Sequence, residues 1–361
     1  FTRLTDSGLG CPDWPGCYGS ASPVGAQAEI TAAQDAMPTG PVTHRKAWVE
    51  MIHRYLATGV GVLIIAMTAS AWAQHRAWRH AKASTAHAGP APGGSPWWPT
   101  FTLLWVCLQG AFGALTVTMK LFPAIVTLHL IGGLVLLALL CVQAVQHTRA
   151  AQGVARVGLP GPLRAALWAT AALVSAQVVL GGWVSTNYAV LACAEFPTCQ
   201  GQWWPDTDFR AGFHLLRPLG GSSEAGYLTL AGLTAIHLTH RGLAMFVALA
   251  LAAHAWHLAR WQVGGVRPWR REARVLAGLL LWQLASGLSN VVLGWPLVAA
   301  LAHTLGAAML VAWLVRLWVL PRGLVPGAAA LGTETKASSA PHADPTRHQG
   351  HHPGGARPAA S

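Results

Sequence analysis

Seven long apolar runs constrain the fold of this chain more than any other feature of its sequence. A helix needs about 20 mostly apolar residues to cross a bilayer, and seven stretches of the 361-residue chain reach that length. Only 10% of the residues are charged, whereas a soluble chain carries roughly a quarter. The sequence therefore predicts an all-α polytopic membrane protein with spans at 48–73, 101–119, 124–146, 163–183, 233–258, 273–293 and 296–320.

Lysine and arginine residues gather in alternate loops between these runs and predict the orientation. The net charge of +12 is spread over short loops and forms no single basic face, which argues against nucleic acid as a partner. Because positive loops stay in the cytoplasm, the two long segments 1–47 and 184–232 are expected on the outer side. We expect one further span before Phe1, which would bring both termini inside. These features predict a multi-pass protein of the bacterial inner membrane, in contact with lipid.

The chain contains an internal repeat. The outer segment FTRLTDSGLGCPDWPGCYG aligns without gaps with WVSTNYAVLACAEFPTCQG in the second long loop. The helices that follow also match, pairing His53-Arg54 with His240-Arg241, and Gln109, Gly113, Val117 and His129 with Gln283, Gly287, Val291 and His303. Such repetition predicts two parallel four-helix-bundle repeats. We place an N-terminal half-bundle at 1–150, a C-terminal half-bundle at 151–322 and a disordered His/Pro/Ala-rich tail at 323–361.

Four of the six cysteines lie in the outer loops, in two pairs with equal spacing. Because the outer side is oxidising, we predict the disulfides Cys11–Cys17 and Cys193–Cys199. The alternative is free or metal-binding thiols. The other two, Cys107 and Cys141, fall inside spans, where a small apolar side chain is expected in the core.

Four histidines lie at similar depth in four spans that start on the outer side: His53, His129, His240 and His303. Each is about five or six residues into its span, or roughly 8–9 Å below the outer surface. A polar ring in a bilayer is costly and usually faces the bundle interior. Two imidazoles on opposite sides of a flat macrocycle form an axial haem pair, whereas zinc usually takes three or four ligands at one centre. We therefore predict one haem site in each half, with these histidines as iron ligands.

Glu50 is the main difference between the two halves. It lies one helical turn before His53, where the second half has His237. An ionisable carboxylate at the lip of a membrane bundle is a functional candidate by default, and the alternative is a solvated interfacial residue. This asymmetry predicts that one half performs chemistry and the other carries electrons. Arg54 and Arg241 are expected either to pair with haem propionates or to support helix packing and extend outward.

These motifs together resemble the haem A synthase family. The resemblance covers 1–320 and is carried by the first outer segment, EMIHR at 50–54, TLHLIGG at 127–133, GGWVSTNYAVLACAEFPTCQGQWWP at 181–205, IHLTHR at 236–241 and LAHTLGA at 301–307. It implies an eight-helix oxidoreductase that converts the C8 methyl group of haem O to a formyl group, giving haem A for cytochrome c oxidase. The first helix of that pattern is absent here, and Gly10 stands where a small polar residue is common.

The resemblance also implies roles for the polar residues. A bound haem b is expected between His240 and His303, with Arg54 and Arg241 as further cofactor-binding candidates. The substrate haem O is expected near His53 and His129, with Glu50 at the reaction site, so these last three are the candidate catalytic residues. The paired cysteines of the first outer loop are implied to matter as well.

Two other functions remain open from the sequence. A dihaem carrier of quinol electrons would hold two permanent haems and make no product. A haem transporter or chaperone would bind haem weakly, and Trp203, Trp204 and Pro205 in the outer loop could serve it. Glu50, present in only one half, favours the enzyme. Haem O synthase is a plausible partner because haem O is too apolar to diffuse through water; the electron donor is unknown, and a homo-oligomer stays open.

Overall fold

The computed structural model describes residues 1–84, 95–152, 159, 161–217, 228–262, 267 and 269–319, and the regular elements within them are helices. Seven of these helices are long and apolar enough to cross a membrane, as the sequence predicts. They are α2 (His44–Ser84), α3 (Trp97–Thr118), α4 (Pro123–Gln152), α5 (Gly161–Thr186), α7 (Leu230–Arg260), α8 (Arg270–Val292) and α9 (Leu297–Val319). The predicted tail at 323–361 lies outside the described residues.

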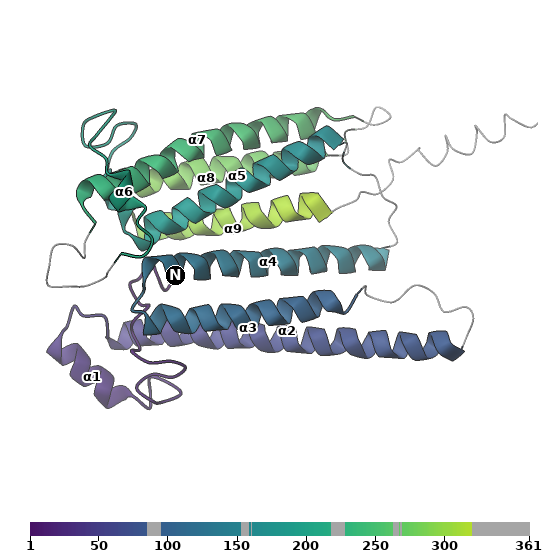
Figure 1. Cartoon of the computed structure of the whole chain (residues 1–361), viewed down its shortest axis with the longest axis horizontal. Helices are drawn as coiled ribbons and strands as arrows, with labels where there is room; N and C mark the ends of the chain where they lie inside the picture. Colours follow the sequence, from purple (N-terminus) through teal and green to yellow (C-terminus); the bar gives the residue numbers. More distant parts are fainter. Residues whose placement is uncertain are drawn as a thin grey trace, which may run out of the picture.

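Short helices occupy the two long loops. The first loop contains α1 (Gln27–Ala36), and the second contains the 3₁₀ helix η1 (Ala189–Ala192) and α6 (Phe209–Gly212). Figure 1 shows α1, α6 and the N-terminus at one end of the row of long helices. Both loops therefore cover the same end of the molecule.

The long helices lie side by side, and the C-terminal four form a closed bundle (Figure 1). In that bundle α5 packs against α7, α7 against α8, α8 against α9, and α9 against α5. Helix α4 packs against both α5 and α9, and α3 and then α2 continue outward from it. The first three spans thus extend one side of a four-helix bundle.

Several helices run past the spans expected from hydropathy. Helix α2 reaches Ser84, although its apolar run ends near residue 73, because the residues that follow include good helix formers such as Arg76, Arg79 and Lys82. The hairpin turns α3–α4 and α8–α9 are as short as predicted. In them Lys120 and Leu121, and likewise Gly294 and Trp295, adopt left-handed backbone angles that reverse the chain.

The interior of the closed bundle is apolar. Its largest cluster of buried side chains joins all four helices and includes Leu167, Leu251, Leu276 and Leu317. Many large apolar side chains on the outer faces of the helices are exposed, as suits surfaces that contact lipid. The core position expected for Cys107 is wrong, because this side chain is exposed, and Cys141 is only half-buried. Positions facing lipid accept a small apolar residue as readily as the core does.

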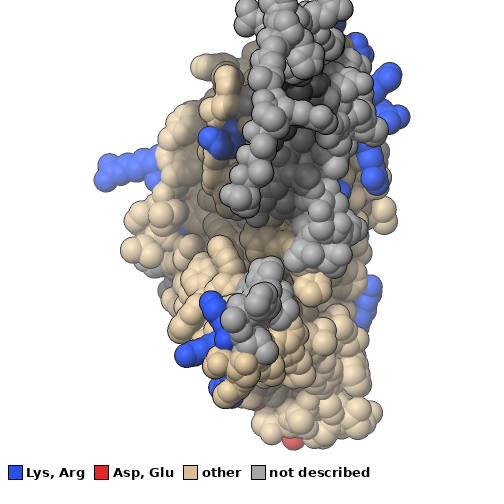
Figure 2. Space-filling view, turned by 90° about the vertical axis from the view of Figure 1, so that its right-hand side faces the viewer, with Lys and Arg blue, Asp and Glu red and all other residues tan. Residues whose placement is uncertain are grey.

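Basic residues gather at the end of the molecule opposite the two long loops. Figure 2 views this end, where Lys and Arg side chains surround the visible face and acidic ones are nearly lacking. The final turns of α2, α7 and α9 there carry Lys82, Arg260 and Arg316. The basic loops that the sequence analysis identified therefore lie together at this end.

Candidate functional site

The four predicted histidines lie near the loop-covered ends of four helices that all begin at that end (Figure 1). His129 and His303 are six residues beyond the first residues of α4 and α9. His53 and His240 are nine and ten residues into α2 and α7, because those helices begin before their predicted spans. At a rise of about 1.5 Å per residue, all four lie within about one and a half turns of a common depth.

The structure brings the histidines together in two pairs, one in each half. His53 lies close enough to His129 for an electrostatic interaction, and His240 lies close enough to His303. The helices that carry each pair make no direct contact: among the described residues, neither α2 with α4 nor α7 with α9 is a packed pair. Each pair of side chains therefore comes from two helices that do not pack directly against each other.

Glycines line the histidine rings on neighbouring helices. A Cβ atom added at Gly113, Gly181 or Gly287 would lie only 3.2–3.3 Å from the Cε1 atom of His129, His240 or His303 respectively. Glycine at these positions lets a helix approach the ring closely while the ring keeps its place. Among the described residues, no group of three or more His, Cys, Asp or Glu side chains is arranged to hold a metal ion. Facing pairs of imidazoles across a gap suit the two axial positions of a haem.

Glu50 is buried, contrary to its alternative interpretation as a solvated interfacial residue. Its side chain lies on α2, and the residue is only 3% exposed. Its Oε2 atom accepts a hydrogen bond from the backbone nitrogen of Cys11 at 2.9 Å, and Oε1 accepts one from Arg54 Nη2 at 2.6 Å. The carboxylate thus joins the first outer loop to α2, one turn from His53.

Arg54 and Arg241 hold the two outer loops. Arg54 Nη1 donates to the backbone oxygens of Asp13, Pro15 and Gly16. Arg241 donates in the same manner to the backbone oxygens of Thr198, Cys193 and Glu195, at 2.8–3.2 Å. Of the alternatives left open by the sequence, this geometry favours support of the local packing.

Disulfides close both loops. Cys11 is bonded to Cys17 and Cys193 to Cys199, and all four residues are buried. Cys17 and Ser20 exchange backbone hydrogen bonds, as do Cys199 and Gln202. With Ala26, Ile30, Ala47 and Met51, the first disulfide forms a small core between the loop, α1 and α2. The loop therefore sits firmly over the helix end that carries Glu50.

The two halves also touch directly at the loop end. Arg3 donates hydrogen bonds to the Tyr188 hydroxyl and to the Ser185 backbone oxygen, both at 2.7 Å, and the hydroxyl in turn donates to Asp6. The guanidinium also lies over the tyrosine ring, 4.0 Å from its centroid. The sequence alone did not predict this contact, because Arg3 and Tyr188 are 185 residues apart in the chain.

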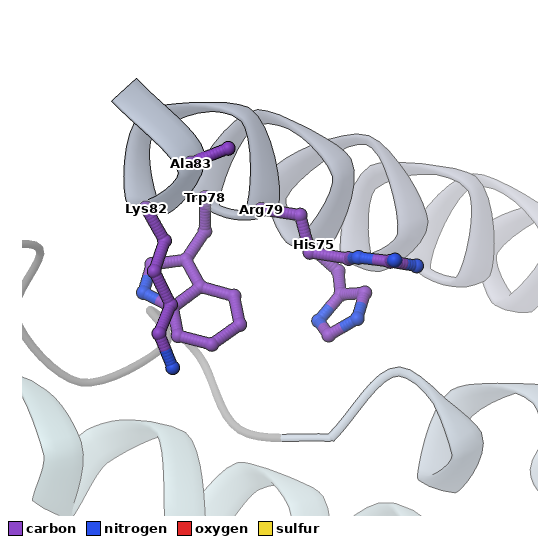
Figure 3. Close-up of a pocket in the computed structure, with 5 residues that line it drawn as sticks. All are labelled: His75, Trp78, Arg79, Lys82 and Ala83. Atoms are coloured by element: carbon purple, nitrogen blue, oxygen red, sulfur yellow. The ribbon is translucent and has the colours of Figure 1, made fainter. Parts of the chain in front are cut away.

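A surface pocket elsewhere does not compete with this site. Figure 3 shows it near the end of α2 that lies opposite the two long loops, lined by His75, Trp78, Arg79, Lys82 and Ala83. Its first lining residue follows His53 by 22 positions on the same helix, which corresponds to about 33 Å. The candidate site is the loop-covered end.

Comparison with known proteins gives a consistent result. A sequence profile of the family described as cytochrome oxidase assembly protein matches residues 1–315. The chain is 36% identical over 316 residues to a protein of Shewanella oneidensis named "Heme A synthase", covering 87% of this chain and 88% of that one. Proteins with the same name from Halalkalibacterium halodurans and Rhizorhabdus wittichii are 25% and 27% identical, over 85% and 87% of this chain and 85% and 86% of their own lengths.

Proposed function

The chain belongs to the cytochrome oxidase assembly protein family, and from this membership we propose that it is a haem A synthase. It is an oxidoreductase of haem A biosynthesis and a multi-pass membrane protein. The proposed reaction oxidises the C8 methyl group of haem O to a formyl group. The product, haem A, serves cytochrome c oxidase.

The observation that carries this proposal is the combination of two facing histidine pairs with a single buried carboxylate. Each pair comes from two helices that do not pack directly against each other, and glycine faces three of the four rings. Only the first half places an acid, Glu50, one turn from its histidine. Two similar haem positions with different surroundings suit an enzyme that uses one position for its substrate and the other for electron transfer.

His240 and His303 would hold haem b, and His53 and His129 would hold the substrate haem O. When bound, haem b supplies reversible one-electron chemistry at its iron. The two histidines of each pair would hold the iron of their haem from two separate helices. The apolar cluster formed by Trp183, Val190, Ile236 and their neighbours packs at the loop end of α5 and α7 and limits water there.

Glu50 is the proposed proton acceptor. Oxidation of a methyl group to a formyl group releases protons as well as electrons, and a carboxylate beside the substrate can take them up. Its two hydrogen-bond donors, Cys11 N and Arg54, hold the carboxylate in one orientation. Arg54 and Arg241 keep the loops closed over the sites. Their guanidinium groups would also lie near the propionate groups of a bound haem.

A dihaem electron carrier is the second candidate, and the similarity of the two histidine pairs favours it. A carrier has no need for an acid in one half only.

We further propose that the loop-covered end faces outward from a bacterial inner membrane. Haem O synthase is the proposed source of the substrate.

Pigment analysis separates the two candidates. The full-length protein should be produced in a bacterium that makes haem O but lacks its own haem A synthase, and the haems of the membranes extracted and identified by mass. The proposal predicts haem A with the wild-type protein and only haem O with His53→Ala. Haem b and haem O without any haem A, in a well-folded wild-type protein, would leave the carrier as the better assignment.

A further inference from the structure

One glutamine accompanies each of three of the histidines, in the same geometry. Gln109 on α3, Gln177 on α5 and Gln283 on α8 each direct the side-chain amide at a histidine of the following long helix. The Gln109 nitrogen lies 3.1 Å from His129 Nδ1 and 2.6 Å from the backbone oxygen of that residue. The Gln177 nitrogen lies 3.1 Å from both corresponding atoms of His240 and 3.3 Å from His240 Nε2.

Gln283 repeats this arrangement at His303. In the amide orientation that its neighbours favour, its nitrogen donates to His303 Nδ1 at 2.9 Å and to the backbone oxygen at 3.2 Å. Ser286 also lies 3.1 Å from this Nδ1 atom. The same pair of contacts therefore occurs on three different helices.

Each glutamine is followed four residues later by the glycine that faces the same ring: Gly113, Gly181 and Gly287. Residues four apart lie on one face of a helix, so the glutamine and the glycine face the same histidine ring. The glutamine contacts the Nδ1 edge, and the glycine leaves room at Cε1. The ring is thereby held by two contacts. At His129 and His303 the glutamine contacts the Nδ1 edge, whereas at His240 the Gln177 amide also reaches Nε2.

We infer that these Gln-x-x-x-Gly motifs are positioning elements that orient the histidines for iron and tune their strength as ligands. This inference rests on the proposed function. A histidine that binds metal through Nε2 carries its proton on Nδ1 and usually donates it to a neighbouring acceptor. A glutamine amide offers both a donor and an acceptor, so it can serve Nδ1 in either protonation state. The Gln177 nitrogen faces the ring, and its buried Oε1 atom has no hydrogen-bond partner within the described residues, so turning the amide would offer Nδ1 an acceptor.

The test uses the pair His240 and His303 in the full-length, haem-loaded membrane protein. The midpoint potential and the electron paramagnetic resonance spectrum of the low-spin haem are measured for Gln177→Leu and Gln177→Glu. A carboxylate at this position accepts a hydrogen bond from Nδ1 and makes the imidazole a stronger donor to ferric iron. Gln177→Glu should therefore lower the potential below that of both the wild type and Gln177→Leu, and Gln177→Leu should alter the spectrum because the ring loses its amide contact. A purely structural role would change both variants alike.

Gln143→Leu is the matched control. Gln143 is also a half-buried glutamine of a spanning helix, and its amide donates to Thr102 and to the Leu139 backbone oxygen, away from the histidines. Its loss should leave potential and spectrum unchanged. Equal potentials in the Gln177→Leu, Gln177→Glu and Gln143→Leu proteins would overturn the inference.

A glycine pair keeps the test decisive if the glutamine variants lose their haem. Gly287→Ala brings a Cβ atom to 3.2 Å from His303 Cε1, so the ring must move by a few tenths of an ångström. Gly278→Ala, on the same helix, meets nothing within 4 Å. The first substitution should alter the spectrum and the second should not, and identical spectra would count against the inference. His240→Ala and His303→Ala report separately on the proposed function: if either keeps the low-spin haem, the haem assignment itself fails.

Discussion

Replacing Glu50 tests its role most directly, but the choice of substitution matters because the carboxylate also holds the first loop. Glu50 is 3% exposed and accepts charged hydrogen bonds from Cys11 N and Arg54. Each such bond contributes about 1.5–3 kcal/mol, so Glu50→Ala, which removes both, should destabilise the loop by about 3–6 kcal/mol. Glu50→Gln keeps the volume and one acceptor oxygen, and roughly half of that loss is expected.

The two variants should therefore differ in stability but share a defect in activity. General acid–base groups contribute typically 10²–10⁴-fold to a rate. Glu50→Gln should assemble and bind haem, while haem O or a partly oxidised intermediate accumulates and haem A formation falls at least about 10²-fold. Extracted haems are quantified by chromatography and mass, and the amount of folded protein by its haem b absorbance.

Asp13→Ala is the control for loop stability. The Asp13 carboxylate accepts hydrogen bonds from the backbone nitrogens of Tyr18 and Gly19 within the same loop and does not contact Glu50. This variant should loosen the loop yet still produce haem A. If Glu50→Gln produced haem A at the wild-type rate, or if Asp13→Ala lost it to the same extent, the proposed proton-transfer role would be wrong.

Three further predictions follow from the same site. Replacing His240 or His303 with alanine should remove a low-spin absorbance band, and unchanged spectra in both variants would exclude them as axial ligands. Mass spectrometry of non-reduced peptides should find Cys11 joined to Cys17 and Cys193 to Cys199, whereas free thiols in the native membrane protein would contradict the pairing. Tyr188→Phe should make the first loop easier to cleave by protease, because the hydroxyl links Arg3 and Asp6. Burial and the Asp6 hydrogen bond raise the pKa of Tyr188. The wild-type contact should therefore persist at neutral pH and weaken only as the pH rises above about 10.

Hydropathy and residue spacing predicted the all-helical membrane class and the seven spanning helices, because both depend on local composition. The ends of the helices were less predictable. Helix α2 continues to Ser84 through charged residues that favour helix without being apolar, so a hydropathy window ends too early there. The exposure of Cys107 was also missed, because an apolar run does not indicate which of its faces meets lipid and which meets protein.

Side-chain partners were the least predictable part of the site. Glu50 and Arg54 were recognised as candidates, but their contacts with Cys11 and the backbone oxygens of the loop depend on how 1–47 folds back over α2. Gln177 and Gly181 were not singled out, because the alignment of the repeats paired only Gln109 on α3 with Gln283 on α8. The spacing of four between glutamine and glycine, present three times, is the signal that would have found them.

The second loop provides the strongest structural reason to assign Glu50 a chemical role. Arg241 holds that loop through three backbone oxygens, as Arg54 does in the first. At the position that matches Glu50 by sequence, Arg241 Nε donates to His237 Nε2 at 3.3 Å, and within the described part of the chain no carboxylate accepts a hydrogen bond from Arg241. A disulfide-closed loop can therefore be held over its helix end without a buried acid. Because a buried carboxylate is costly to maintain in a membrane protein and is dispensable for this clamp, its presence beside His53 alone is best explained by the proton chemistry proposed for the first half.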